Sequence, residues 1–236
     1  MKTDVRSFEP VRLLIVDLLA ERHGFGREGV AEIVRHFRPN EVFLWSPHIT
    51  DRLTYEVGEV VEGPMEADAI VITGSRRNVT SWEPWMDDVV ELIRGCDVPL
   101  YGICFGHQII AKAFGGEVVR APHSTDLVGE VRYADGRVVH AAFAHQDHVV
   151  DAGELVPLAQ ADHCGIVACM HPTRPIRTVQ FHPELTEKVL AKACETGEMT
   201  TQEVRGYAME RVSTDVTTAL LLLNGFAPSH ERRASS

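Results

Sequence analysis

A cysteine flanked by glycines is the first feature of this sequence that could carry chemistry. Cys104 lies between the apolar run 98–103 and the segment 106–114, which has helical spacing, and Gly102 and Gly106 stand two residues before and two residues after it. A residue on such a sharp strand-to-helix turn needs small neighbours, and its side chain then stands above the sheet at the positive end of the helix. That field favours the thiolate, so the pattern predicts that Cys104 is a nucleophile.

A second motif, far downstream, offers the groups that a thiolate nucleophile needs. Amide cleavage requires a residue that protonates the leaving amine and a third group that orients this residue. His182 and Glu184 follow an apolar strand two residues apart, so their side chains point to the same side. A histidine near a glutamate is usually only a solvated pair, but with Cys104 the two predict a Cys-His-Glu triad.

The other four cysteines have no comparable setting and are expected to be ordinary thiols. An odd number of irregularly spaced cysteines in a chain of 236 residues is not a disulfide framework and fits a reducing compartment. We therefore expect a cytoplasmic protein. These cysteines are Cys96, Cys164, Cys169 and Cys194.

Short apolar runs alternate with helical segments in the first half of the chain. Buried strands that alternate with helices indicate a parallel sheet covered on both faces. We expect a three-layer α/β sandwich with a central, mostly parallel sheet and the active site at the carboxyl ends of its strands. The strand candidates are 13–18, 42–45, 69–73 and 98–103, and the helix candidates are 27–37, 84–94 and 106–114.

The chain changes character after residue 116. Short strand-like pieces at 117–120, 127–133, 138–143, 166–170 and 178–181 predict a strand-rich half with some antiparallel pairing. The segment 185–223 has mainly helical character, with a break near Gly197. We expect one domain over residues 1–226, in which 185–226 is a C-terminal helical extension. The polar tail 227–236 is expected to fray.

The charge balance excludes two classes of partner. The chain has 34 acidic and 23 basic residues, a net charge of -11, and would repel phosphate backbones and anionic lipids. Its early apolar stretch, 11–20, contains Arg12 and Asp17 and is too short to span a bilayer. Neither nucleic acid nor a membrane is expected as a partner.

Together, the two motifs resemble the class I glutamine amidotransferases, whose glutaminase domains carry Gly-x-Cys-x-Gly-x-Gln and a later His-Pro-Glu. The first motif is matched from Gly102 to Gln108. The resemblance covers roughly residues 11 to 184 and is strongest to the glutaminase domain of GMP synthase and to free-standing gamma-glutamyl peptidases. Further matches are the Gly-Ser turn in 72–75, a tryptophan at 82 or 85, and the stretch 144–149 in place of Ser-His-x-Asp-x-Val.

The resemblance implies a role for each of these residues. Cys104 would attack the side-chain carbonyl of glutamine or another gamma-glutamyl compound, His182 would shuttle protons and Glu184 would orient it. Glutamate and ammonia or an amine would be released, without cofactor or metal. The backbone N–H groups of Gly74 and Phe105 would form the oxyanion hole. Gln108 would bind substrate together with His145 and Asp147, which would lie in a loop over 145–147.

Two positions depart from the family pattern. Ala144 stands where relatives usually have serine, and Arg76-Arg77 stands where they often have proline. The arginines could attract a carboxylate, although an exposed pair of arginines is more often only solubilising.

Three alternatives stay open at this stage. The cluster of His140, His145, Asp147 and His148 contains good ligands for zinc or iron, but lacks a second grouped set. A chain with this fold could also be a non-catalytic interaction subunit. Finally, the chain could be a glutaminase that supplies ammonia to a separate ATP-dependent synthetase. Its partner could thus be a synthetase, or the chain could form a homo-oligomer. No Gly-rich phosphate loop follows Glu184, so we expect a self-contained hydrolase.

Overall fold

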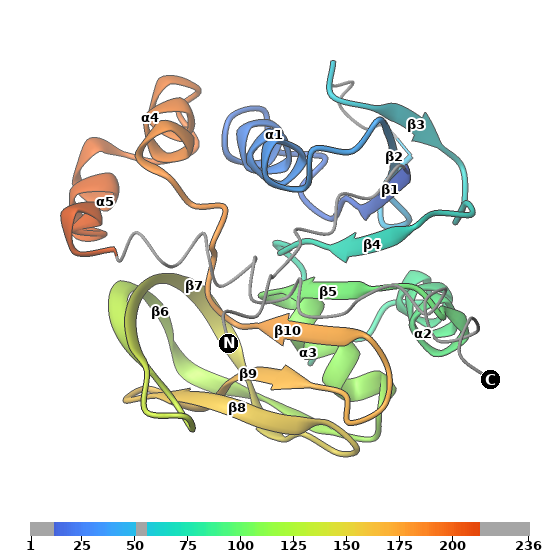
Figure 1. The fold of residues 1–236 in the computed structure, drawn as a ribbon. Coiled ribbons are helices and arrows are strands. Elements are labelled where there is room, and N and C mark those ends of the chain that lie inside the picture. The colour runs from blue at the N-terminus through green and yellow to red at the C-terminus, as the bar shows by residue number, and fades with distance from the viewer. Residues whose placement is uncertain (1–11, 51–55, 213–236) are drawn as a thin grey trace, which may run out of the picture.

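One ten-stranded mixed sheet organises the protein, and the computed structural model describes residues 12–50 and 56–212 of it (Figure 1). Six strands are parallel to their neighbours, in the order β3 (Glu59–Val61), β2 (Glu41–Trp45), β1 (Arg12–Val16), β4 (Ala69–Ile72), β5 (Leu100–Ile103) and β10 (Ile176–Val179). Antiparallel pairing then adds β9 (Cys164–Met170), β8 (Val156–Ala161), β6 (Glu117–Tyr133) and β7 (Val138–Asp151).

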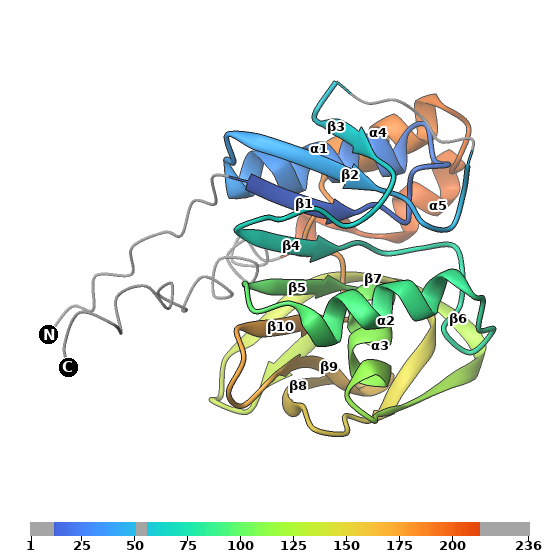
Figure 2. The ribbon, with the colours of Figure 1, turned by 90° about the vertical axis from the view of Figure 1, so that its right-hand side faces the viewer.

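Helices cover both faces of the parallel part (Figure 2). One face carries α1 (Phe25–Phe37) and α4 (Glu187–Glu195), which is followed by α5 (Thr201–Gly206) and the 3-10 turn η1 (Met209–Arg211). The other face carries α2 (Trp85–Gly95) and α3 (Phe105–Ala113). The three-layer α/β architecture predicted from the sequence is confirmed.

The central strands are apolar at every position because both of their faces are buried. In β1, Leu13 and Ile15 pack in the core with α1, whereas Leu14 and Val16 pack with α2 and α3. All four side chains have no exposed surface. This explains why the first-half strands were recognisable as short continuous runs.

The strand-rich half differs from its predicted outline. The pieces 117–120 and 127–133 form one strand, β6, whose pairing with β7 shifts register between Arg120 and Thr125. Pro122 is tolerated there because β6 pairs with β8 only at its far end, through Arg132 and Tyr133. The strands β3 and β8 were not predicted.

The stretch 145–147, expected in a loop, lies inside β7. Burial alternates along it, so that His145 and Asp147 are buried while Gln146 is partly exposed. Polar residues on the buried face of a strand resemble a loop in sequence, and this caused the wrong prediction.

The region after residue 184 is helical with a break, as predicted. Gly197 has a φ of 74° and ends the α4 segment, and α5 begins with a capping box between Thr200 and Glu203. The predicted helix over 213–223 and the tail 227–236 lie outside the described residues. No helix in the ranges 12–50 and 56–212 is long and apolar enough to cross a membrane.

Two glycines allow α3 to approach the sheet closely. A Cβ at Gly106 would lie 2.3 Å from the carbonyl oxygen of Ile72, and one at Gly102 would lie 2.6 Å from the carbonyl carbon of Gly106. Both obstacles are backbone atoms, so no side chain can rotate away. The glycines of the cysteine motif are therefore required by packing.

We predict that Gly106→Ala lowers the free energy of unfolding by about 1–3 kcal/mol, because overpacking shifts the backbone. Gly95→Ala is the matched control, since a Cβ there meets no atom within 4 Å and alanine favours the helix. Urea denaturation of both variants measures the difference. Equal stabilities would contradict the packing role of Gly106.

Candidate active site

Cys104 occupies the sharp turn between β5 and α3. Its φ of 53° and ψ of -101° lie in a region that costs a non-glycine residue about 1–3 kcal/mol. The Cys104 N–H donates to the Val179 carbonyl at 2.8 Å, which ties the turn to β10. The predicted strand-to-helix turn is confirmed, and strain of this kind is typical of functional sites.

His182 and Glu184 form a buried pair after β10. The Nδ1 atom of His182 lies 2.7 Å from Oε1 of Glu184, and the two residues are only 4% and 3% exposed. The His182 N–H donates to the Ala142 carbonyl at 2.8 Å, and the edge of the imidazole meets Phe25. The orientation of the ring is therefore held by β7, by α1 and by the carboxylate.

Gly74, in the loop after β4, marks the point where Cys104 and His182 meet. A Cβ at Gly74 would lie 3.0 Å from Cε1 of His182 and 3.5 Å from Cβ of Cys104. Burial by itself would lower the pKa of His182, but the charges of Glu184 and Cys104 outweigh it and raise the pKa well above its usual value. The protonated imidazole is therefore stabilised by Glu184 and by Cys104.

Two buried residues beside Cys104 have unpaired backbone donors. The N–H groups of Gly74 and Phe105 meet no acceptor among residues 12–50 and 56–212. The Gly74 loop is fixed by Thr73, whose N–H donates to the Val16 carbonyl at 3.2 Å and whose carbonyl accepts from Gly106 N–H at 3.2 Å. Unpaired amides in a buried, rigid setting suit a developing negative charge.

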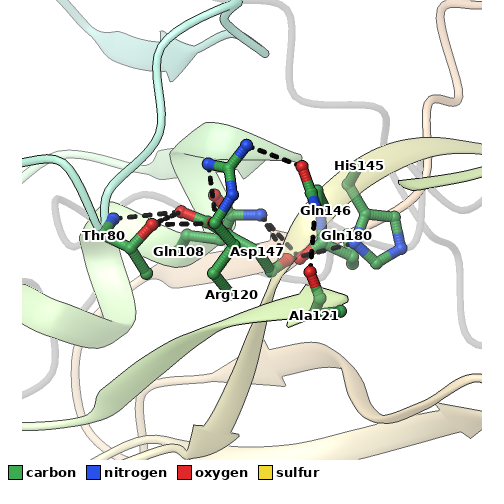
Figure 3. Close-up of polar contacts among 8 residues, drawn as sticks. All are labelled: Thr80, Gln108, Arg120, Ala121, His145, Gln146, Asp147 and Gln180. Atoms are coloured by element: carbon green, nitrogen blue, oxygen red, sulfur yellow. Dashed lines mark hydrogen bonds and ion pairs between the residues drawn. The ribbon is translucent and has the colours of Figure 1, made fainter. Parts of the chain in front are cut away.

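Gln108 and Asp147 belong to a polar brace behind the cysteine turn (Figure 3). The Asp147 carboxylate accepts hydrogen bonds from the backbone N–H and the hydroxyl of Thr80, at 3.0 and 2.8 Å. The Gln108 amide donates to the Asp147 carbonyl at 2.9 Å and to the side-chain oxygen of Gln180 at 3.1 Å. Nδ1 of His145 lies 3.0 Å from the same Asp147 carbonyl.

A cavity of about 370 Å³ opens beside His182, and neither Gln108, His145 nor Asp147 lines it. Its charged lining comes from the β1–α1 loop, the loop after β4, β6 and the segment after α4. These charged residues are Glu21, Arg22, Arg76, Asp126, Glu198 and Glu203, and Tyr207 also lines the cavity. Sequence reasoning singled out only Arg76, because no spacing rule links such distant segments.

The histidines of the strand-rich half do not assemble a metal centre. No group of three metal-binding side chains suited to an ion occurs in the described part of the chain. Nε2 of His145 lies 3.1 Å from Nε2 of His163, and burial lowers the pKa of His145 to about 3, so this ring is neutral. All five cysteines are free thiols.

Comparisons with known proteins identify the family of this chain. The family described as "Glutamine amidotransferase class-I" matches residues 34–196. A glutamine amidotransferase-like protein of Schizosaccharomyces pombe is 27% identical over 61% of this chain and 64% of its own length. A subunit of the glutamine-hydrolyzing GMP synthase of Methanocaldococcus jannaschii is 33% identical over 54% of this chain and 70% of its own length.

Solved structures share the fold. A glutamine amidotransferase from Thermotoga maritima superimposes with a TM-score of 0.65 at 16% identity, over 91% of this chain and 94% of that one. A second glutamine amidotransferase, from Methylobacillus flagellatus, gives a TM-score of 0.57 at 19% identity, over 92% and 90% of the two chains. The family match covers more than half of the sequence, and the chain belongs to the class I glutamine amidotransferases.

Proposed function

We propose that this protein hydrolyses a gamma-glutamyl amide bond through a thioester on Cys104. The observation that carries the proposal is the meeting of Cys104, at a strained turn, with the buried His182–Glu184 pair. Membership of the family supports glutamine hydrolysis in general, and the five free thiols fit the reducing cytoplasm.

Each group has one role in the proposed reaction. The Cys104 thiolate attacks the gamma-carbonyl carbon, and the carbonyl electrons move to the oxygen, which the Gly74 and Phe105 N–H groups stabilise. Collapse breaks the C–N bond, and His182 gives its proton to the departing nitrogen. His182 then takes a proton from water, which attacks the thioester and releases glutamate and the thiolate. Glu184 keeps the imidazole oriented.

The polar brace has a supporting role in this scheme. Gln108 and Asp147 connect the start of α3, β7 and the Thr80 loop, so they hold the elements that carry the reacting groups. Direct contact of Gln108, His145 and Asp147 with the glutamyl group remains a prediction from the family resemblance.

Replacing the nucleophile should abolish turnover. We predict that Cys104→Ala lowers kcat for every gamma-glutamyl substrate by roughly 10⁴-fold or more, that His182→Ala is nearly as damaging, and that Glu184→Gln is milder because it only orients. Glutamate release measures this, and Cys194→Ala, a half-buried thiol on α4, is the control. A diazoketone analogue of glutamine should label Cys104 alone. Substantial activity in Cys104→Ala would refute the mechanism.

The raised pKa of His182 predicts a defined pH dependence. The imidazolium persists above the usual histidine pKa, so activity should hold through neutral pH and fall as pH rises through the raised value. Glu184→Gln removes the larger of the two charges that raise the pKa of His182, so it should move this alkaline limb of kcat/KM to lower pH. NMR titration of the ring gives an independent reading. If the alkaline limb of kcat/KM stays at the same pH in Glu184→Gln, Glu184 does not raise the pKa of His182.

Arg76 is proposed to hold the alpha-carboxylate that every gamma-glutamyl substrate carries. Its guanidinium lines the cavity and has no ion-pair partner among the described residues, whereas Arg77 lies 4.0 Å from Glu83 and outside the cavity. We predict that Arg76→Gln raises KM about tenfold for glutamine, as expected for a charge-assisted hydrogen bond, with little change in kcat. Arg77→Gln is the matched control. If Arg76→Gln and Arg77→Gln raise KM equally, Arg76 does not hold the alpha-carboxylate.

A second candidate function has its own support. Several relatives are named as subunits of a glutamine-hydrolyzing GMP synthase, so this chain could supply ammonia to a separate ATP-dependent synthetase. We favour the self-contained hydrolase because four residues of the chain's own C-terminal segment, Glu198, Met199, Glu203 and Tyr207, line the cavity beside His182. Negligible turnover by the isolated protein, restored by orders of magnitude on adding a co-purifying synthetase, would favour the second candidate.

A further inference from the structure

The cavity beside His182 is the place for the leaving half of the substrate. His182 must lie within hydrogen-bonding distance of the departing nitrogen in order to protonate it. Its Nε2 is buried and has no hydrogen-bond partner within the described ranges, and the residue lines the cavity. Whatever the nitrogen carries therefore extends into this space.

The cavity is much larger than ammonia requires. Its volume is about 370 Å³, whereas a water-sized molecule occupies about 30 Å³ in the liquid. The glutamyl carboxylate held by Arg76 takes up part of this space, and an ammonia leaving group would take up only about 30 Å³ more. An organic amine fills it better, so the volume favours a substituted gamma-glutamyl amide.

One part of the wall of this cavity, formed by Glu198, Met199, Glu203 and Tyr207, comes from a segment beyond the family match, which ends at residue 196. Glu198 fastens this segment to the start of α1, because its carboxylate accepts from the Phe25 N–H at 3.0 Å and pairs with Arg22 at 3.1 Å. Tyr207 fastens it to β6, because its hydroxyl donates to Asp126 at 3.3 Å. The wall is therefore held from two sides.

The same wall lies close to the chemistry. Burial and the charge of Asp126 raise the pKa of the buried Tyr207 phenol, and the charge of Cys104 adds to this effect. Ala144, whose carbonyl lies 3.6 Å from the Cys104 sulfur, lines the cavity as well. A group held by the wall is thus near the reacting sulfur.

The charges of the lining select the kind of amine. Glu198 is paired with Arg22, and Arg76 is assigned to the glutamyl carboxylate. The charged lining that remains is acidic, and its hydrogen-bond partners carry no fixed positive charge. Asp126 accepts from the Tyr207 hydroxyl, Glu203 accepts from the Thr200 N–H, and Glu21 lies 2.9 Å from Nε2 of His48, whose pKa is lowered by burial. An added positive charge would be attracted and an added carboxylate repelled.

We propose that the substrate is the gamma-glutamyl amide of an amine with a second, cationic amino group, which Asp126 and Glu203 bind in the cavity beside His182. This inference rests on the proposed function and names its substrate class. It assigns the segment after α4 as the part of the chain that determines specificity.

Three substrates of equal length test the proposal. They are gamma-glutamyl amides of an amine with four methylenes that ends in a methyl, an ammonium or a carboxylate group. Asp126 and Glu203 are both exposed, and each should attract the ammonium and repel the carboxylate only modestly. Together they should give the ammonium compound a kcat/KM about tenfold above that of the carboxylate compound. The ratio within one enzyme preparation is unaffected by partial loss of fold.

Conservative variants then locate the effect. Asp126→Asn keeps an acceptor for Tyr207, and Glu203→Gln keeps the capping box, so both should fold. In the double variant the ratio should fall to about twofold or less, because both attractive charges are gone. Glu195→Gln is the matched control, since Glu195 lies on α4, pairs with Lys192 and does not line the cavity.

The possible outcomes distinguish the proposed substrate from the proposed function. A tenfold preference that the double variant loses and Glu195→Gln retains supports the proposal. Equal rates, or a preference for the carboxylate compound, overturn it while Cys104-dependent glutamine hydrolysis leaves the proposed function standing. A preference that survives in the double variant overturns the roles of Asp126 and Glu203. Failure to cleave any of the amides or glutamine overturns both proposals.

Discussion

The close packing of the first turn of α3 against β4 is the constraint on which the site depends. Gly106 has no Cβ and sits against the Ile72 carbonyl, and its N–H bonds to Thr73 at 3.2 Å. To reach this position within two residues of β5, the chain must turn at Cys104 with a φ of 53°. The same contact fixes the Thr73–Gly74 loop beside the cysteine. The turn at Cys104, its strained backbone and the N–H groups of Gly74 and Phe105, unpaired among the described residues, thus have one cause, which is the close packing of α3 against β4.

A second constraint brings the segment after α4 to the site. Gly24 makes this possible, because a Cβ there would lie 2.2 Å from the Thr196 hydroxyl. With α4 packed so closely against the start of α1, the Glu198 carboxylate can accept from the first amides of that helix, where the helix dipole favours negative charge. Cys104 follows β5 and the His182–Glu184 pair follows β10, while residues of this added segment line the cavity beside His182.

The polar brace is a buried network of hydrogen bonds behind the cysteine turn. Asp147 and Gln108 are almost fully buried, and the Asp147 carboxylate, the Asp147 carbonyl and the Gln108 amide nitrogen all have protein partners. Buried hydrogen bonds of this kind favour one arrangement of the segments that they join. Here the arrangement joins three separate segments behind the cysteine turn. This accounts for polar residues on the inner face of β7, where an apolar residue would be expected.

The sequence by itself determined four strands of the parallel part, β1, β2, β4 and β5, together with the cysteine turn and the pairing of His182 with Glu184, since each rests on local spacing. Apolar runs reveal strands that are buried on both faces, and two residues of separation suffice to align an imidazole with a carboxylate. Only the tertiary structure decided the continuity of β6, the strand position of residues 145–147 and the lining of the cavity. These depend on contacts between residues such as Asp126 and Tyr207, which are 81 positions apart and have no common periodicity. Long-range packing, which local patterns do not encode, selects such contacts.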